Sequence, residues 1–412
     1  MLFLLLTTLL STSPASQSFA IENVTIEVGD GTTLPRATVW VDQGRIRAVG
    51  ETVQIPASVH RVDGRGQVLT PGLFETQTQL GLFEVEAEDS TVDHQYAGDH
   101  ITPDFRAVDG FNPSNVRIPI ERQEGVTHVV SSPKGGLLFG SGFLFQLSGE
   151  MNSVVKEETG LFGSIDIGAT HGQGNSRPGL WMKMRQLFDD AIFYRKHQKR
   201  VDQGQTRPLA LSTSKLKALW PVLDGKRRLV LTAHRASDLI RAVEFRNAMR
   251  EKGYPVQLVL VGGTEAWKVK ETLAKEQVPV ILTPSAQMPY SFSMLYARDD
   301  NPALLEKAGV QVVLSSATWA NNVRRLRQEA GLAVANGMTR EGALRAISLT
   351  PAEVFGLEQD YGSIQPGKRA NLVLWSADPL ELGTHARHMW IDGKPIRLND
   401  RQLNLAKKYL GR

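Results

Sequence analysis

Acidic and histidine side chains gather in one stretch of the sequence. Between residues 84 and 100 the chain carries, in order, Glu84, Glu86, Glu88, Asp89, Asp93, His94, Asp99 and His100. Carboxylates and imidazoles are common metal ligands, so this stretch could hold a cation through His94 or His100. A loop whose acidic side chains are simply solvated has the same composition. His171, in a glycine-rich run, leaves the same choice open between a metal ligand and a residue packed in a loop.

Two glutamines and one histidine form a second group of candidates. Gln77 and Gln79 are two residues apart, and alternate residues of a strand share a face, so both amides can point the same way. They can bind a polar ligand, or they can hydrogen-bond each other and the nearby backbone. His234, which is followed by Arg235, can bind a ligand or pack as a hydrogen-bonded core residue.

Several function classes find no support in the sequence. The segment Gly140-Ser141-Gly142 is not the G-x-S-x-G elbow of a serine hydrolase, and it does not match a phosphate-binding loop. The chain has 412 residues, no cysteine and a net charge of +4. This composition is that of an ordinary globular protein, and so small an excess of positive charge does not indicate nucleic-acid binding.

Two patterns predict the elements that position these residues. Short alternating segments with hairpin turns lie near both chain ends, which predicts one small β-domain built from both ends. These strands are expected at Val24 to Val28, Ala37 to Val41, Arg45 to Val49, Asn371 to Trp375 and His388 to Ile396.

In the middle of the chain, apolar runs alternate with amphipathic stretches. The runs are 229–232, 256–261, 278–282 and 310–314, and the stretches are 238–252, 264–276 and 321–336. Repeated βα units over roughly 280 residues predict a (β/α)8 barrel, with a doubly wound sheet as the alternative. A further helix is expected to begin with Thr350 as its N-cap and Pro351 as its first residue.

The N-terminus resembles a secretory signal peptide. Leu2 to Leu10 is apolar except for two threonines, and small residues follow as far as Ala20. We therefore expect a signal peptide over residues 1–20 and an exported, periplasmic protein, with a buried N-terminal strand as the alternative. No segment is long and apolar enough to predict a membrane span.

Several segments resemble the amidohydrolase superfamily, in its imidazolonepropionase-like and prolidase-like branch. Residues 71–81 read PGLFETQTQLG, where the usual form is PGL-(I/F)-D-x-H-T-H-L-G, and residues 233–238, 263–266, 343–357 and 362–368 resemble later segments. The resemblance implies an α/β fold with a TIM-type (β/α)8 barrel over 68–357. It also implies a β-sandwich over 21–67 plus 358–400 and a C-terminal tail over 401–412.

The resemblance also implies what the site would be. Active relatives hold zinc or another divalent metal at the barrel mouth, through an HxH on strand 1, histidines on strands 5 and 6, and an aspartate on strand 8. The positions that match these ligands here are Gln77, Gln79, Thr232, Gly262 and Ala317, and His234 is the second histidine of the strand 5 motif. Amides, a hydroxyl, a glycine and an alanine are poor substitutes for those ligands. We therefore expect no cofactor and no catalytic residue of the family type, and we take Gln77, Gln79, His234 and Arg235 as ligand-binding candidates.

These observations lead to one hypothesis and one alternative. The hypothesis is an exported amidohydrolase-family protein that has lost its catalytic metal and serves as a non-catalytic partner or binding subunit. It would form a homo-oligomer, join an active amidohydrolase in a hetero-oligomer, or bind a small amide. The alternative is an active hydrolase of carbon-nitrogen bonds in peptide-like or cyclic amide substrates, with a relocated metal site or none.

Overall fold

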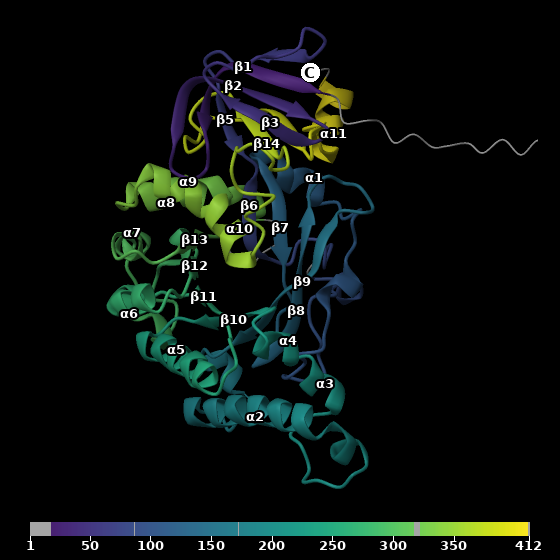
Figure 1. Ribbon diagram of the computed structural model, residues 1–412, viewed down its shortest axis with the longest axis vertical. Helices are drawn as coiled ribbons and strands as arrows, with labels where there is room; N and C mark the ends of the chain where they lie inside the picture. The colour runs from purple at the N-terminus through teal and green to yellow at the C-terminus, as the bar shows by residue number, and fades with distance from the viewer. Residues whose placement is uncertain (1–17, 86, 172, 317–321, 411–412) are drawn as a thin grey trace, which may run out of the picture.

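The computed structural model of this chain describes residues 18–410, apart from residues 86, 172 and 317–321. It contains one mixed sheet and, beneath it in Figure 1, a second sheet surrounded by helices. Most of the predicted signal peptide lies outside the described residues. Its end does not, because Phe19 and Ala20 are buried at the start of the first strand.

The first sheet combines strands from both chain ends, as predicted. Its order is β16-β15-β14-β5-β1-β2-β3, with β4 also paired to β1. The strands are β1 (Phe19–Glu27), β2 (Thr33–Asp42), β3 (Arg45–Gly50), β4 (His60–Asp63), β5 (Val68–Pro71), β14 (Leu372–Trp375), β15 (Ala386–Ile391) and β16 (Lys394–Pro395). Because β5 belongs to this sheet, the sheet extends beyond the predicted boundary at residue 67.

The tight turns of this sheet follow the sequence signals. Asp392 and Gly393 between β15 and β16 have φ angles of 49° and 72°, and Gln43 and Gly44 between β2 and β3 have 50° and 76°. Two successive positive φ angles are what a two-residue type I′ turn requires. The two predicted hairpins are therefore present.

The second sheet has eight strands that curve into a nearly closed barrel. Its order is β13-β12-β11-β10-β9-β8-β7-β6. The strands are β6 (Leu73–Thr78), β7 (Val126–Ser131), β8 (Leu138–Gln146), β9 (Val154–Ser164), β10 (Arg228–Ala233), β11 (Leu258–Gly262), β12 (Val280–Leu282) and β13 (Val312–Leu314). The strands predicted from the four apolar runs are all present in this sheet.

One part of the barrel departs from a regular βα alternation. Strand β8 runs antiparallel to both β7 and β9, whereas the other neighbouring pairs are parallel. The reason is the length of the connections, which span only residues 132–137 and 147–153. A parallel crossover needs a dozen or more residues, so segments this short can only form hairpins.

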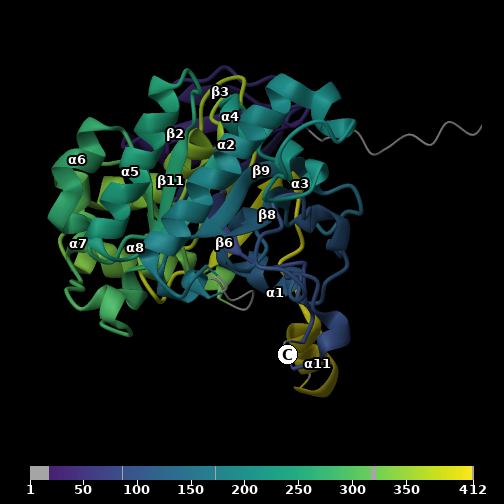
Figure 2. The ribbon, with the colours of Figure 1, turned by 90° about the horizontal axis from the view of Figure 1, so that it is seen from below.

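Helices cover the outside of the remaining strands (Figure 2). They are α1 (Ile118–Glu121), α2 (Arg177–Asp202), α3 (Thr213–Lys217), α4 (Trp220–Leu223), α5 (Ala236–Glu251), α6 (Lys270–Lys275), α7 (Asn301–Lys307), α8 (Leu326–Ala335), α9 (Arg340–Ala346) and α10 (Leu349–Phe355). A further helix, α11 (Arg401–Leu410), occupies the predicted C-terminal tail. None of the described helices is long and apolar enough to cross a membrane.

The predicted start of α10 was wrong by two residues. The helix begins at Leu349 with Ser348 in the N-cap position, so Thr350 lies inside its first turn. Pro351 is tolerated there because the first N–H groups of a helix have no partner within it. Helix α10 packs Ala352 and Phe355 against Phe74, Val230 and Val313, which fill the barrel below its mouth.

The sheet from both chain ends is fixed to the barrel through buried groups. Trp375 of β14 is fully buried and packs in the same hydrophobic cluster as residues of the barrel and its helices. Arg327 of α8 pairs with Glu124 at 2.7 Å and also donates to the carbonyl of Thr384 at 2.7 Å. The two regions are therefore held together by packing and by hydrogen bonds.

Candidate functional site

A cavity lies where the parallel barrel strands end. Its volume is about 190 Å³. It is lined by Gln77, Thr232, His234, Val261, Gly262, Thr264, Thr283, Ala286 and Gln287. These residues come from the ends of β6, β10 and β11 and from the segment after β12. The carboxyl ends of barrel strands are where TIM-type barrels place their sites, so this cavity is the candidate site.

The imidazole of His234 forms part of the cavity wall. Nδ1 of His234 is 2.7 Å from Oγ1 of Thr264, so the two side chains share a hydrogen bond. Burial lowers the pKa of His234, and the carboxylate of Asp166 opposes this shift only in part. The ring is therefore neutral at physiological pH.

Gly262 makes room for that ring. Its φ of +90° suits glycine, and a Cβ atom placed there would lie 2.5 Å from Cε1 of His234. Real Cβ atoms do not approach other heavy atoms this closely, so no larger residue fits at 262 while His234 keeps its place. His234 thus occupies the space that a side chain at 262 would need.

The other predicted residues are placed as follows. Gln77 and Thr232 line the cavity, whereas Gln79 is buried and is not part of the lining. Arg235 is exposed just before α5 and does not line the cavity either. Ala317 lies outside the described residues. The structure therefore brings Gln77, Thr232, His234 and Gly262 together at one cavity.

A buried carboxylate that sequence reasoning did not single out lies next to Gln77. Glu75 is fully buried and accepts hydrogen bonds from the N–H groups of Thr76 and Gln77. It also accepts from the hydroxyl of Ser315 at 2.6 Å and from the N–H and hydroxyl of Ser316 at 2.8 and 2.5 Å. Burial raises the pKa of Glu75, and these hydrogen bonds oppose the rise. Because β6 and β13 are the first and last strands of the sheet, we call this contact the barrel seam.

The acidic stretch after β6 does not gather into one site. His94 is buried and makes a T-shaped ring contact with Phe83, whereas His100 and His171 are exposed. Asp99 pairs with Lys215 at 2.5 Å, and Glu84 accepts from Asn112 at 2.8 Å. Glu86 lies outside the described residues. Within the described part of the chain, no three His, Asp or Glu side chains come together in a way that could hold a metal.

Few signals in the sequence point to the other cavity residues. Gln287 accepts a hydrogen bond from Asn301 at 2.9 Å and donates to the Thr283 carbonyl at 3.2 Å, so its amide is fixed by its neighbours. Thr264 follows Gly262-Gly263 and is almost fully buried. Only the position of each residue just after a strand could have suggested its place in the site.

Comparison with known proteins supports the family. The model of the amidohydrolase family matches residues 308–397. The amidohydrolase tasK of Hapsidospora irregularis is 23% identical over 388 residues, which cover 86% of this chain but 39% of tasK. The chain therefore spans about two fifths of the length of that relative.

Two solved structures resemble the whole chain. An amidohydrolase from Thermotoga maritima MSB8 is 27% identical, with a TM-score of 0.81, over 92% of this chain and 99% of its own. A putative prolidase from Bifidobacterium longum is 18% identical, with a TM-score of 0.51, over 97% of this chain and 99% of its own, and it shows likeness of fold alone. The composite sheet, the barrel and these matches agree, and the chain belongs to the amidohydrolase superfamily.

Proposed function

We propose that this chain is a non-catalytic binding or partner subunit whose barrel mouth does not hold the metal of its family. The observation that carries the proposal is the position of the His234 ring against Gly262. Residue 262 matches the strand 6 histidine of metal-binding relatives, and a histidine there would collide with His234.

The chemistry of the lining supports the same conclusion. A zinc site needs three or four nitrogen, carboxylate or thiolate ligands. The cavity wall offers one imidazole, the amides of Gln77 and Gln287, and threonine hydroxyls. The Gln287 amide already has protein partners. This donor set does not fit zinc.

The cavity suits a small polar ligand without strong charge. The described residues of its lining include no Asp, Glu, Lys or Arg, so a charged ligand would lose its hydration without gaining an ionic partner among them. A small amide can exchange hydrogen bonds with Gln77 and with the hydroxyls. Binding of such an amide and assembly with another subunit are compatible roles for a barrel without its metal.

Metal analysis tests the proposal directly. Protein purified without chelator from zinc-supplemented medium should contain well under one equivalent of Zn, Mn, Ni or Fe. A metal-dependent amidohydrolase purified in parallel shows that the procedure retains bound metal. One equivalent of metal in the wild type that is lost in His234→Ala would overturn the proposal.

The partner role has its own experiment. Co-expression with an active amidohydrolase should yield a mixed complex in size-exclusion chromatography with mass measurement. A monomer in every pairing, together with a bound amide, would leave ligand binding as the role of the chain.

A second candidate function is hydrolysis of carbon-nitrogen bonds without the family metal. It is favoured by the hydrogen bond between His234 and Thr264, because an imidazole next to a hydroxyl can act as general base for a nucleophile. Turnover of dipeptides, N-acyl amino acids or cyclic amides that disappears in both His234→Ala and Thr264→Val would support it. Turnover at background in the wild type would leave the non-catalytic role.

We also propose that the chain is exported to the periplasm. Phe19 and Ala20 pair with Val41 and Trp40 in the first sheet, so removal of both residues would shorten a buried strand. Cleavage on the N-terminal side of Ser18 would leave that strand whole. The mass of the chain recovered from a periplasmic extract tests both export and this cleavage position.

A further inference from the structure

Helix α11 presents an apolar face that the rest of the described chain does not bury. At 100° per residue, Leu403, Leu405, Ala406, Tyr409 and Leu410 fall on one side of the helix, with Gln402 as the one polar residue among them. Tyr409 and Leu410 are 71% and 69% exposed, and Leu403 and Leu405 are each 41% exposed. The opposite side carries Arg401, Asn404, Lys407 and Lys408, and the helix has no acidic residue.

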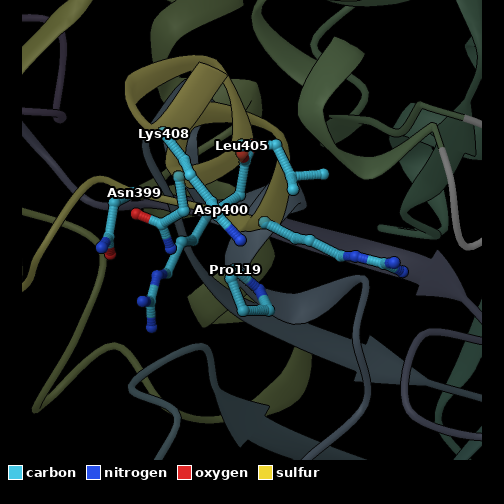
Figure 3. Close-up of a pocket in the computed structure, with 8 residues that line it drawn as sticks. Pro119, Asn399, Asp400, Leu405 and Lys408 are labelled. Carbon is cyan, nitrogen blue, oxygen red and sulfur yellow. The ribbon is translucent and has the colours of Figure 1, made fainter. Parts of the chain in front are cut away.

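The cationic side of α11 borders a groove of about 470 Å³ (Figure 3). Pro119 and Arg122 form the facing wall, and Arg401, Asn404, Leu405 and Lys408 of the helix form the other. The single carboxylate of the lining, Asp400, is already engaged, because it accepts from the Gln123 amide and from the N–H of Leu403. The groove therefore has an excess of positive charge.

Arg122 adds a buried cation without a carboxylate partner. It is 9% exposed and donates to the carbonyls of Leu147, Ser148 and Arg397, while its Nε has no hydrogen-bond partner. In the part of the chain that the structure describes, Arg122, Arg401, Lys407 and Lys408 form no ion pair. An anion in the groove would meet three cations, Arg122, Arg401 and Lys408, against the one carboxylate of Asp400 in the described lining.

We propose that α11 and this groove form a peripheral binding surface for anionic phospholipid. A free phosphate would account for the cations but not for the exposed apolar side of the helix. A lipid surface accounts for both, since its phosphates meet the basic groups and its acyl boundary receives the leucines and the tyrosine. A protein partner is less suited, because lysine is depleted in protein interfaces, whereas basic side chains add to binding at anionic membranes.

Vesicle sedimentation of the full chain tests the proposal. The chain should bind vesicles of phosphatidylcholine mixed with phosphatidylglycerol, and binding to phosphatidylcholine alone should be much weaker. The double variant Lys407→Gln/Lys408→Gln should bind roughly 10- to 30-fold more weakly, and Tyr409→Ser/Leu410→Ser should also lose binding. Added salt should weaken the binding of the wild type.

Matched controls separate this surface from the rest of the chain. Lys196→Gln/Lys199→Gln removes two exposed lysines from α2 and should leave vesicle binding unchanged. All variants keep the same N-terminal residues, so the apolar run Leu2 to Leu10 contributes equally to each. Three results would overturn the proposal. They are equal binding of wild type and α11 variants, binding of inorganic phosphate without vesicle binding, and self-association that Tyr409→Ser/Leu410→Ser abolishes.

Discussion

The barrel seam and the barrel mouth lie side by side on strand β6, but they contain different kinds of polar group. At the seam, the buried carboxylate of Glu75 accepts hydrogen bonds from its own strand and from Ser315 and Ser316. At the mouth, the lining residues that the structure describes are neutral, and His234 is the only titratable side chain among them. A carboxyl group lies where it joins the ends of the sheet, whereas no carboxyl group is among the described residues that line the cavity.

This difference indicates which part of the barrel serves stability and which part serves binding. A buried carboxyl group is tolerated only when its hydrogen-bonding capacity is met, so the seam must be held in one geometry. The described lining of the mouth includes no buried carboxyl group, so this constraint does not apply there. Substitutions at the seam should therefore lower the free energy of unfolding, while those at Gln77 should change binding with little effect on folding.

The largest effect is expected for Glu75→Ala. It would leave the buried donors of Ser315, Ser316 and Gln77 without an acceptor, at a cost of about 4 kcal/mol in the free energy of unfolding. Glu75→Gln should cost about half as much, since an amide oxygen can still accept some of these bonds. Urea unfolding measures both. A loss below about 1 kcal/mol for Glu75→Ala would show that the seam does not hold the barrel together.

Gly262→Ala should come next, with a loss of about 3 kcal/mol. An alanine at 262 would have to keep the positive φ of this residue, and its Cβ would collide with the ring of His234. In a His234→Ala background the same change should cost less, because the collision is removed while the backbone strain remains. A double-mutant cycle measures this coupling. Additive effects would contradict the close contact.

Burial of His128 should make stability fall in acid. His128 stacks on Phe74, and burial lowers its pKa to about 3, whereas the unfolded chain has an ordinary histidine pKa. Between these two values the unfolded state binds the extra proton, so stability is lost as pH falls from 7 to 5 by about 2 kcal/mol. His128→Phe should remove this part of the slope and keep the stacking. An unchanged slope in the variant would place the acid sensitivity elsewhere.

The smallest change in folding is expected at the mouth. Gln77→Ala should alter the free energy of unfolding by less than about 1 kcal/mol, since its side chain is only partly buried. Its effect should appear in binding, as a weaker thermal shift with a probe such as 2-pyrrolidinone. If Gln77→Ala lowered the free energy of unfolding as much as Glu75→Ala, the seam and the mouth would not differ in their contribution to stability.

Strand positions and hairpin turns could be predicted because they follow from local patterns. The apolar run at 229–232 and the Asp392-Gly393 turn signal the elements that contain them. The antiparallel strand β8 was missed because its direction depends on the short connections around it. The role of Glu75 was missed because its partners Ser315 and Ser316 are far away in the sequence. The start of α10 was misplaced because the helix begins after Ser348 without a side-chain cap, so no capping signal marks its first residue.

The composite sheet sets an order in which this chain can complete its fold. Strand β5 lies between β1 and β14, so one edge of β5 has no neighbour until residues 372–375 have been synthesised. An open strand edge invites pairing with other chains. The N-terminal strands therefore stay incomplete until the C-terminal strands reach them and close the first sheet.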